Sequence, residues 1–172
     1  MMNQHVFFPE EWSKFSTEKE ISWQEVYNRE FLSDIPLLYD AAYYNGIETL
    51  RPWEVTIHTV PAVLGKWENM KAVLYEKFSI RDQASTLYPM KIGIGLFLEI
   101  LYWSNGQPVL WKKNGDVLLS NKPVNWEERL EFILDYPKKY HSFIQLTELI
   151  SEIEKIFVKQ QTVMNMKKAS KS

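Results

Sequence analysis

The sequence contains no cysteine. This absence excludes disulfide bonds, thiolate-bound zinc, iron–sulfur clusters and cysteine nucleophiles. Glycine and proline are also sparse, at 6 and 8 residues, and they do not gather into a linker within the 172 residues. We therefore expect one folded domain over residues 1–160, in a reducing compartment such as the cytoplasm.

Long apolar runs are missing as well. The longest, Ile92–Trp103, is interrupted by Glu99 and is shorter than the ~20 residues that a membrane span needs. The first nine residues lack both the cationic start and the apolar stretch of a signal peptide, and they lead directly into Glu10 and Glu11. We expect neither a membrane segment nor an export signal.

Neither sign of charge is in large excess. The net charge is -2 and the isoelectric point is about 6.0, which does not indicate a broad nucleic-acid surface. The charge is uneven, however: acidic residues dominate Glu10–Asp34, whereas Lys159–Ser172 contains lysines and no acid. These two segments could form ion pairs with each other, or the basic segment could bind an acidic partner. We predict residues 161–172 as a disordered basic tail, because no apolar period continues there.

Aromatic residues, in contrast, are abundant: the chain has 7 Trp, 9 Tyr and 9 Phe. Such rings supply large buried areas and often need a polar partner for the indole N–H or phenol O–H. Two interpretations remain open, a bulky core or a groove lined by some of the rings.

Helical periodicity dominates the chain and predicts an all-α fold. Apolar residues recur every three or four positions over 59–78 and 142–160, which indicates amphipathic helices. The segment 89–104 is apolar on nearly all sides, so we predict a helical bundle around it as a central helix. Gly93 and Gly95 within it favour close helix packing over a phosphate-binding loop, because the other residues of such a loop are absent.

Shorter signals mark the ends of other elements. Ser22–Glu25 and Asn125–Glu128 both have the pattern of a helix start in which a capping side chain is followed three residues later by glutamate. A helix is also predicted from Pro36 to Asn45. Asn114-Gly115, flanked by apolar triplets, predicts a small hairpin-like insertion near residues 109–119.

No spacing in the sequence is typical of a catalytic or metal site. The three histidines, His5, His58 and His141, are far apart, and no Gly-x-Ser-x-Gly elbow occurs. We assign no catalytic residue, no cofactor and no metal ligand. His141, at the entrance of the last helix, is kept only as a candidate binding residue.

Glu99 is the residue whose position is costly, since burying a carboxylate without a partner costs several kcal/mol or raises its pKa. One interpretation is structural, with Glu99 reaching a polar stripe or an arginine elsewhere. The other places Glu99 with Tyr102 and Trp103 in an aromatic-lined pocket as an anchor for a ligand.

The string Arg51-Pro52-Trp53-Glu54 has a similar ambiguity. Arg51 and Glu54 are suited to a surface ion pair while Trp53 fills the core. Alternatively, Arg51 and Trp53 form a recognition edge, because arginine and tryptophan dominate binding hot spots.

Two further strings, KPVNWEERL at 122–130 and YHSFIQL at 140–146, together with RPWE at 51–54, resemble the YpoC-like proteins of bacilli and their relatives. The resemblance covers most of residues 30–157. It implies a cytoplasmic helical protein without an established activity, cofactor or catalytic residue, so no residue role is carried over from it.

Two hypotheses for function follow from these observations. The first is a non-catalytic accessory factor that offers an aromatic-rimmed groove or a helix face to another protein. The second is a small-molecule-binding protein or enzyme that uses Glu99 in a helical pocket. An exposed apolar patch favours the first, and a closed pocket with Glu99 facing inward favours the second. The sequence does not indicate an oligomeric state.

Overall fold

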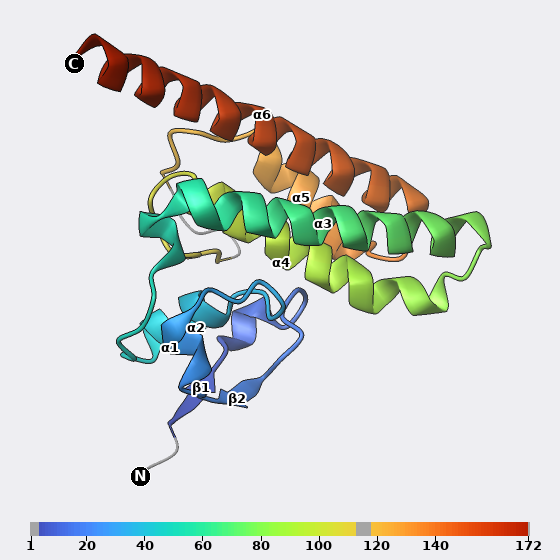
Figure 1. The fold of residues 1–172 in the computed structure, drawn as a ribbon. Coiled ribbons are helices and arrows are strands. Elements are labelled where there is room, and N and C mark those ends of the chain that lie inside the picture. The colour runs from blue at the N-terminus through green and yellow to red at the C-terminus, as the bar shows by residue number, and fades with distance from the viewer. Residues whose placement is uncertain (1–3, 113–117, 172) are drawn as a thin grey trace.

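A computed structural model describes residues 4–112 and 118–171 (Figure 1). This part of the chain is mainly helical, as the sequence predicts. Its elements are, in order, β1 (His5–Phe7), η1 (Glu10–Trp12), β2 (Glu20–Ser22), α1 (Val26–Arg29), α2 (Leu38–Tyr44), η2 (Pro52–Glu54), α3 (Thr56–Ser79), η3 (Ala84–Thr86), α4 (Leu87–Trp103), α5 (Trp126–Asp135) and α6 (Tyr140–Ser170), where η marks a single 3₁₀ turn.

Helix α4 is the most deeply buried element and packs against both α3 and α6. The close helix packing predicted at Gly93 is present: a Cβ atom there would lie 2.7 Å from the Trp67 ring of α3 and 3.0 Å from Leu146 of α6. At Gly95 an added Cβ atom would instead lie 3.0 Å from Pro36, which precedes α2 and belongs to no helix. Among the described residues, only 84–103 are long and apolar enough to cross a membrane, and 72% of their most apolar window is buried within the fold. That burial is what a core helix shows.

The N-terminal residues form a separate layer on one side of the long helices (Figure 1). In it β1 and β2 pair antiparallel, with Val6 opposite Ile21, and β1 contacts α2. The sequence did not predict these strands, because three residues are too few to show an alternating pattern. The helix start predicted at Ser22–Glu25 is wrong: Ser22 ends β2, and α1 is a single turn without a side-chain cap.

Two other predictions concern the second half of the chain. The turn of the predicted hairpin, Asn114-Gly115, lies outside the described residues, and the flanking residues 109–112 and 118–121 contain no strand. Helix α6 continues to Ser170, through most of the segment predicted as a disordered tail. No glycine or proline interrupts residues 161–170, whose Gln, Met, Lys and Ala have high helix propensity.

Candidate functional site

A groove of about 660 Å³ opens where the C-terminal half of α6 leaves the body of the protein. Ile156, Val163 and Met164 of α6 form one wall. Trp53 of η2 and Trp103 at the end of α4 form the other, so the groove has aromatic and aliphatic sides. We call this hollow the α4–α6 groove. Of the described residues that line it, Lys159 alone carries a charge, and none of them is Asp, Glu or His.

The short turn η2 holds Trp53 in the wall of the groove. Pro52 occupies the first turn of η2, where its fixed φ is favourable, and Trp53 is 6% exposed. The hydroxyl of Thr59 in α3 donates a hydrogen bond of 2.8 Å to the carbonyl of Pro52, which ties η2 to the start of α3. The predicted core role of Trp53 and its place in a recognition edge are therefore compatible, because one ring serves both.

The floor of the groove is the turn that ends α4. Gly106 adopts a left-handed φ of 72°, which a residue with a side chain rarely adopts, and this lets the chain reverse after Trp103. Gln160 of α6 donates a 3.3 Å hydrogen bond to the carbonyl of Ser104 across the floor. The hydroxyl oxygen of Ser104 is buried without a hydrogen-bond partner in the described structure.

A buried carboxyl group supports Trp103 from behind. Asp40 of α2 accepts hydrogen bonds from the indole N–H of Trp103 at 2.9 Å and from the backbone N–H of Val109 at 2.7 Å. Asp40 is fully buried, and desolvation raises its pKa from 3.8 to about 6 although both hydrogen bonds act to lower it. One wall of the groove is thus positioned by a group that titrates in the folded protein.

Glu99 of α4 makes a second hydrogen-bonded contact between α4 and the α2 region. Its carboxyl oxygen Oε2 accepts a 3.2 Å hydrogen bond from the backbone N–H of Leu37, just before α2. Glu99 is 2% exposed, and burial, followed by the nearby Asp40, raises its pKa well above the ordinary range. Together α2 binds the end of α4 through Asp40, and α4 binds the start of α2 through Glu99.

This geometry gives Glu99 a backbone amide and a second carboxyl group as neighbours rather than an arginine. None of the ion pairs among the described residues involves Asp40 or Glu99. One oxygen of each, Asp40 Oδ1 and Glu99 Oε1, has no hydrogen-bond partner there. We call these two residues the carboxyl pair. Asp40 gave the same signal in the sequence as Glu99, an acid within the apolar run Leu37–Ala42, and sequence reasoning missed it.

The remaining predicted site residues lie in different places. Arg51 is exposed beside the groove: it pairs with Glu54 at 3.6 Å, and its guanidinium lies 5.7 Å from the ring of Tyr43, which in turn meets Trp53 edge-on. Tyr102 is buried with its hydroxyl unpaired, and its ring meets Trp126. His141 is exposed, with its ring edge-on to that of Phe132 in α5. The structure brings Arg51 and Trp53 together and leaves His141 apart.

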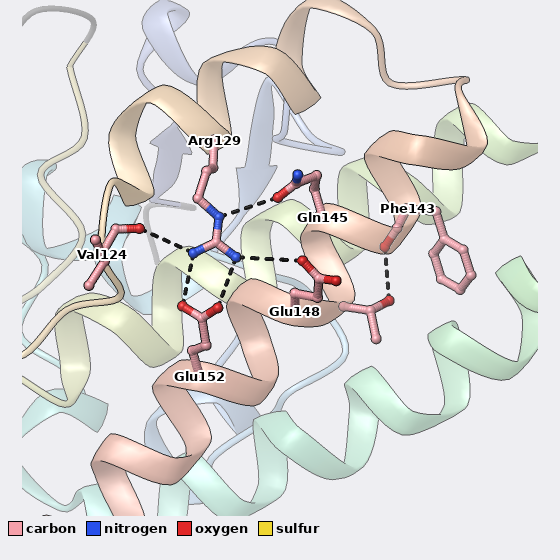
Figure 2. Close-up of polar contacts among 7 residues, drawn as sticks. Val124, Arg129, Phe143, Gln145, Glu148 and Glu152 are labelled. Atoms are coloured by element: carbon pink, nitrogen blue, oxygen red, sulfur yellow. Dashed lines mark hydrogen bonds and ion pairs between the residues drawn. The ribbon is translucent and has the colours of Figure 1, made fainter.

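Sequence reasoning also missed a polar cluster that joins α5 to α6 (Figure 2). Arg129 of α5 makes a two-pronged contact with Glu152 of α6, at 2.8 and 3.0 Å, and also donates to Gln145 and to the carbonyl of Val124. Glu148 lies 3.9 Å from the same guanidinium. The hydrogen bonds to Glu152 raise the pKa of Arg129 further, so it stays charged. The spacing of the polar residues 145, 148 and 152 on one face of α6 was the available signal.

The C-terminal half of α6 carries a concentration of positive charge. Residues 155–171 include five lysines and no acidic residue, and none of these lysines makes an ion pair within the described part of the chain. The acidic N-terminal segment does not pair with them either: the described ion pairs of its acidic residues join Glu20 to His5 and Asp34 to Lys66. No group of three or more metal-ligating side chains occurs among residues 4–112 and 118–171.

The fold and groove define a small, mainly helical protein with an open surface hollow. The chain belongs to the YpoC-like protein family, whose model matches residues 57–165, from α3 into the last part of α6. A curated relative, the uncharacterized protein YpoC of Bacillus subtilis (strain 168), is 40% identical over 111 residues, which cover 63% of this chain and 68% of the relative. No solved structure matches the chain. The name of this relative states no activity.

Proposed function

We propose that this protein is a non-catalytic cytoplasmic accessory factor that holds a segment of another protein in the α4–α6 groove. The observation that carries the proposal is the helix that overhangs the groove. Val163 and Met164 of α6, which line the groove, are 43% and 50% exposed, on the part of the helix that extends beyond the body (Figure 1). Isolated helices are marginally stable in water, so a partner that covers this face also stabilises it.

The chemistry of the lining supports binding over catalysis. The groove combines two tryptophans with a methionine, residue types that are enriched in the buried parts of protein interfaces. General acid–base chemistry needs a titratable group within hydrogen-bond reach of the substrate. In the described lining Lys159 is the one ionisable side chain, at an exposed position on α6.

The alternative role of Glu99, as the anchor of a ligand pocket, has less support. The carboxyl group of Glu99 is enclosed between α4, the start of α2 and Asp40. A ligand that bound this carboxyl group would have to replace its hydrogen bond from the Leu37 amide or separate α2 from α4. We therefore propose a structural role for the carboxyl pair.

Site-specific photo-crosslinking in living cells tests the proposed function. A photoreactive amino acid at Met164 is expected to form an adduct with another protein, because this side chain faces the groove. The same amino acid at Ile80, 67% exposed at the far end of α3, is the matched control and should form none. Adding Trp53→Ala should remove the adduct at position 164. Equal crosslinking at both positions, or none at 164, contradicts the proposal.

A further inference from the structure

We infer that the segment held in the groove is an acidic amphipathic helix of a different protein, with its apolar side chains between Trp53 and Met164 and its carboxylates against the lysines of α6. This inference rests on the proposed function and names the chemistry of the partner. Three observations carry it: the lysines of the acid-free part of α6, the direction of the groove along a helix, and the recessed position of Trp103 in its wall.

The lysines of α6 are distinguished by the stretch in which they lie, because residues 155–171 hold five lysines and no acidic residue. Lys14, Lys66 and Lys71 each lie within 4 Å of a carboxylate of this chain. In contrast, Lys155, Lys159, Lys167, Lys168 and Lys171 have no such contact in the described structure, and all five are exposed. Such a concentration of cations, with Lys159 at the groove itself, is complementary to an acidic surface and steers its approach.

The shape of the groove favours a helix. The α6 side chains that line it include Ile156, Gln160, Val163 and Met164, which recur at helical spacing and therefore follow one face of α6. An element that contacts all of them must run beside α6 for about two turns, since each residue adds 1.5 Å along the axis. An amphipathic helix laid into an apolar groove makes this contact, with anchors every three or four residues.

The same features disfavour three other occupants. A second copy that used the same face would bring the lysines of the two α6 helices close to each other. A bilayer surface is flat, whereas the wall at Trp103 is recessed between α6 and η2, and Trp103 is fully buried. A nucleic-acid backbone would satisfy the lysines while leaving the apolar walls uncovered.

The experiment measures binding of the full chain to synthetic helical peptides of about 20 residues, a length that supports appreciable helicity. One peptide has leucine and phenylalanine on one face and glutamate on the other. A second has lysine in place of glutamate, and a third has the acidic composition in scrambled order. Fluorescence anisotropy of the labelled peptides should show that the acidic amphipathic peptide binds and that the other two bind at least about tenfold more weakly.

Charge reversal in the protein provides the matched test. Lys159→Glu, at the groove, should weaken the acidic peptide by about threefold to tenfold and strengthen the lysine peptide. Lys19→Glu makes the same change in net charge at an exposed position of the N-terminal layer and should alter neither affinity. Both side chains are exposed, so both variants should retain the circular dichroism spectrum of the parent.

Several results overturn the inference. If the scrambled or basic peptide binds as well as the acidic one, the partner is not an acidic helix, although a crosslink at Met164 would still support the proposed function. Tighter binding of anionic phospholipid vesicles or of duplex DNA than of the acidic peptide assigns the lysines to phosphate groups. Concentration-dependent dimerisation that Lys159→Glu abolishes assigns the face to a second copy.

Discussion

Asp40 and Glu99 are enclosed in the fold without a cation among the described residues. A carboxylate is tolerated in such a place when it accepts hydrogen bonds, and it is neutralised when it does not accept enough of them. Asp40 accepts two hydrogen bonds and Glu99 accepts one. Burial and the nearby Asp40 raise the pKa of Glu99 well above its ordinary range, against the single hydrogen bond from Leu37 that acts to lower it. The amide that donates this hydrogen bond to Glu99 belongs to Leu37, whose φ is 70°. This left-handed conformation costs energy for leucine. The hydrogen bond to Glu99 helps to hold that conformation.

Substitution Glu99→Gln is expected to leave the free energy of unfolding at pH 7 unchanged within about 1 kcal/mol, or to raise it, because the amide keeps the acceptor oxygen and removes a proton-binding group. Glu99→Leu should cost about 1–3 kcal/mol, since it leaves the buried Leu37 amide unpaired. Chemical denaturation of both variants checks this. A Gln variant as unstable as the Leu variant would show that the charge itself stabilises the fold.

The titration of Asp40 predicts a dependence of stability on pH. Its folded pKa of about 6 is above the ordinary 3.8, so the folded state binds the proton more tightly than the unfolded state. The unfolding free energy therefore falls as pH rises from about 4 through 6, by an amount on the order of 3 kcal/mol for this group. Asp40→Asn keeps the shape and should flatten this part of the pH profile. The difference between the two profiles is the measurement, and parallel profiles would exclude Asp40 as the source.

Helices α3 to α6 are joined by contacts of two kinds. Gly93 lets α3 and α6 approach α4, and a side chain there would overlap Trp67. Arg129 instead links α5 to α6 through a two-pronged contact that is only 19% exposed on the arginine side. The contact at Gly93 requires that this position has no side chain, whereas the contact at Arg129 requires its guanidinium group. The two contacts are therefore tested by different substitutions.

Substitution Gly93→Ala should lower the free energy of unfolding by about 1–3 kcal/mol, because the added methyl group overpacks the core between Trp67 and Leu146. Gly65→Ala is the control within a helix: nothing lies within 4 Å of the new atom, and the higher helix propensity of alanine should stabilise the protein by up to about 1 kcal/mol. Thermal denaturation of the two variants should give shifts of opposite sign.

Substitution Arg129→Ala should destabilise the protein by about 1–2 kcal/mol, since Glu152 loses both of its hydrogen bonds from the guanidinium. Arg51→Ala removes the exposed pair with Glu54 and should change stability by no more than about 0.5 kcal/mol. A double-mutant cycle of Arg129→Ala with Glu152→Gln isolates the coupling. A coupling energy near zero would mean that the contact is only incidental to stability.

The molecule as a whole divides into the α3–α6 helices, which the family match covers, and an N-terminal layer, which lies outside the match. Asp40 and Trp53 belong to the unmatched part, whereas Glu99, Trp103 and Met164 belong to the matched part. The groove and the carboxyl pair are thus both built where the two parts meet. The last turns of α6 extend beyond the N-terminal layer and the other helices (Figure 1).

Truncation after Gln161 should lower the melting temperature by no more than a few degrees, because residues 162–171 are all exposed. The same truncation removes Val163 and Met164 from the groove and should abolish binding of the acidic peptide. Truncation after Glu152 also removes Ile153 and Phe157, which are buried, and should lower the melting temperature by about 10 °C or more. A large loss of stability from the shorter truncation would show that the overhang supports the fold.

Helix positions follow from local patterns and were largely predictable. The apolar period over 59–78 corresponds to α3, and the apolar segment 89–104 corresponds to α4. The start of α5 was found near Asn125, but the expected capping hydrogen bond is absent, because Asn125 adopts a left-handed backbone with φ of 56° instead. A capping pattern thus marks a chain reversal without fixing its geometry.

The local sequence determined where the main helices lie, that a helix packs closely at Gly93, and that Trp53 lies beside Arg51. Each of these features depends on the spacing of a few neighbouring residues. Tertiary structure alone decided that Glu99 meets Leu37, 62 positions away, and that Trp103 meets Asp40, 63 positions away. It also decided that residues 161–170 overhang a groove. These contacts arise when distant elements pack together, and the free energy of that packing belongs to pairs of segments rather than to either segment alone.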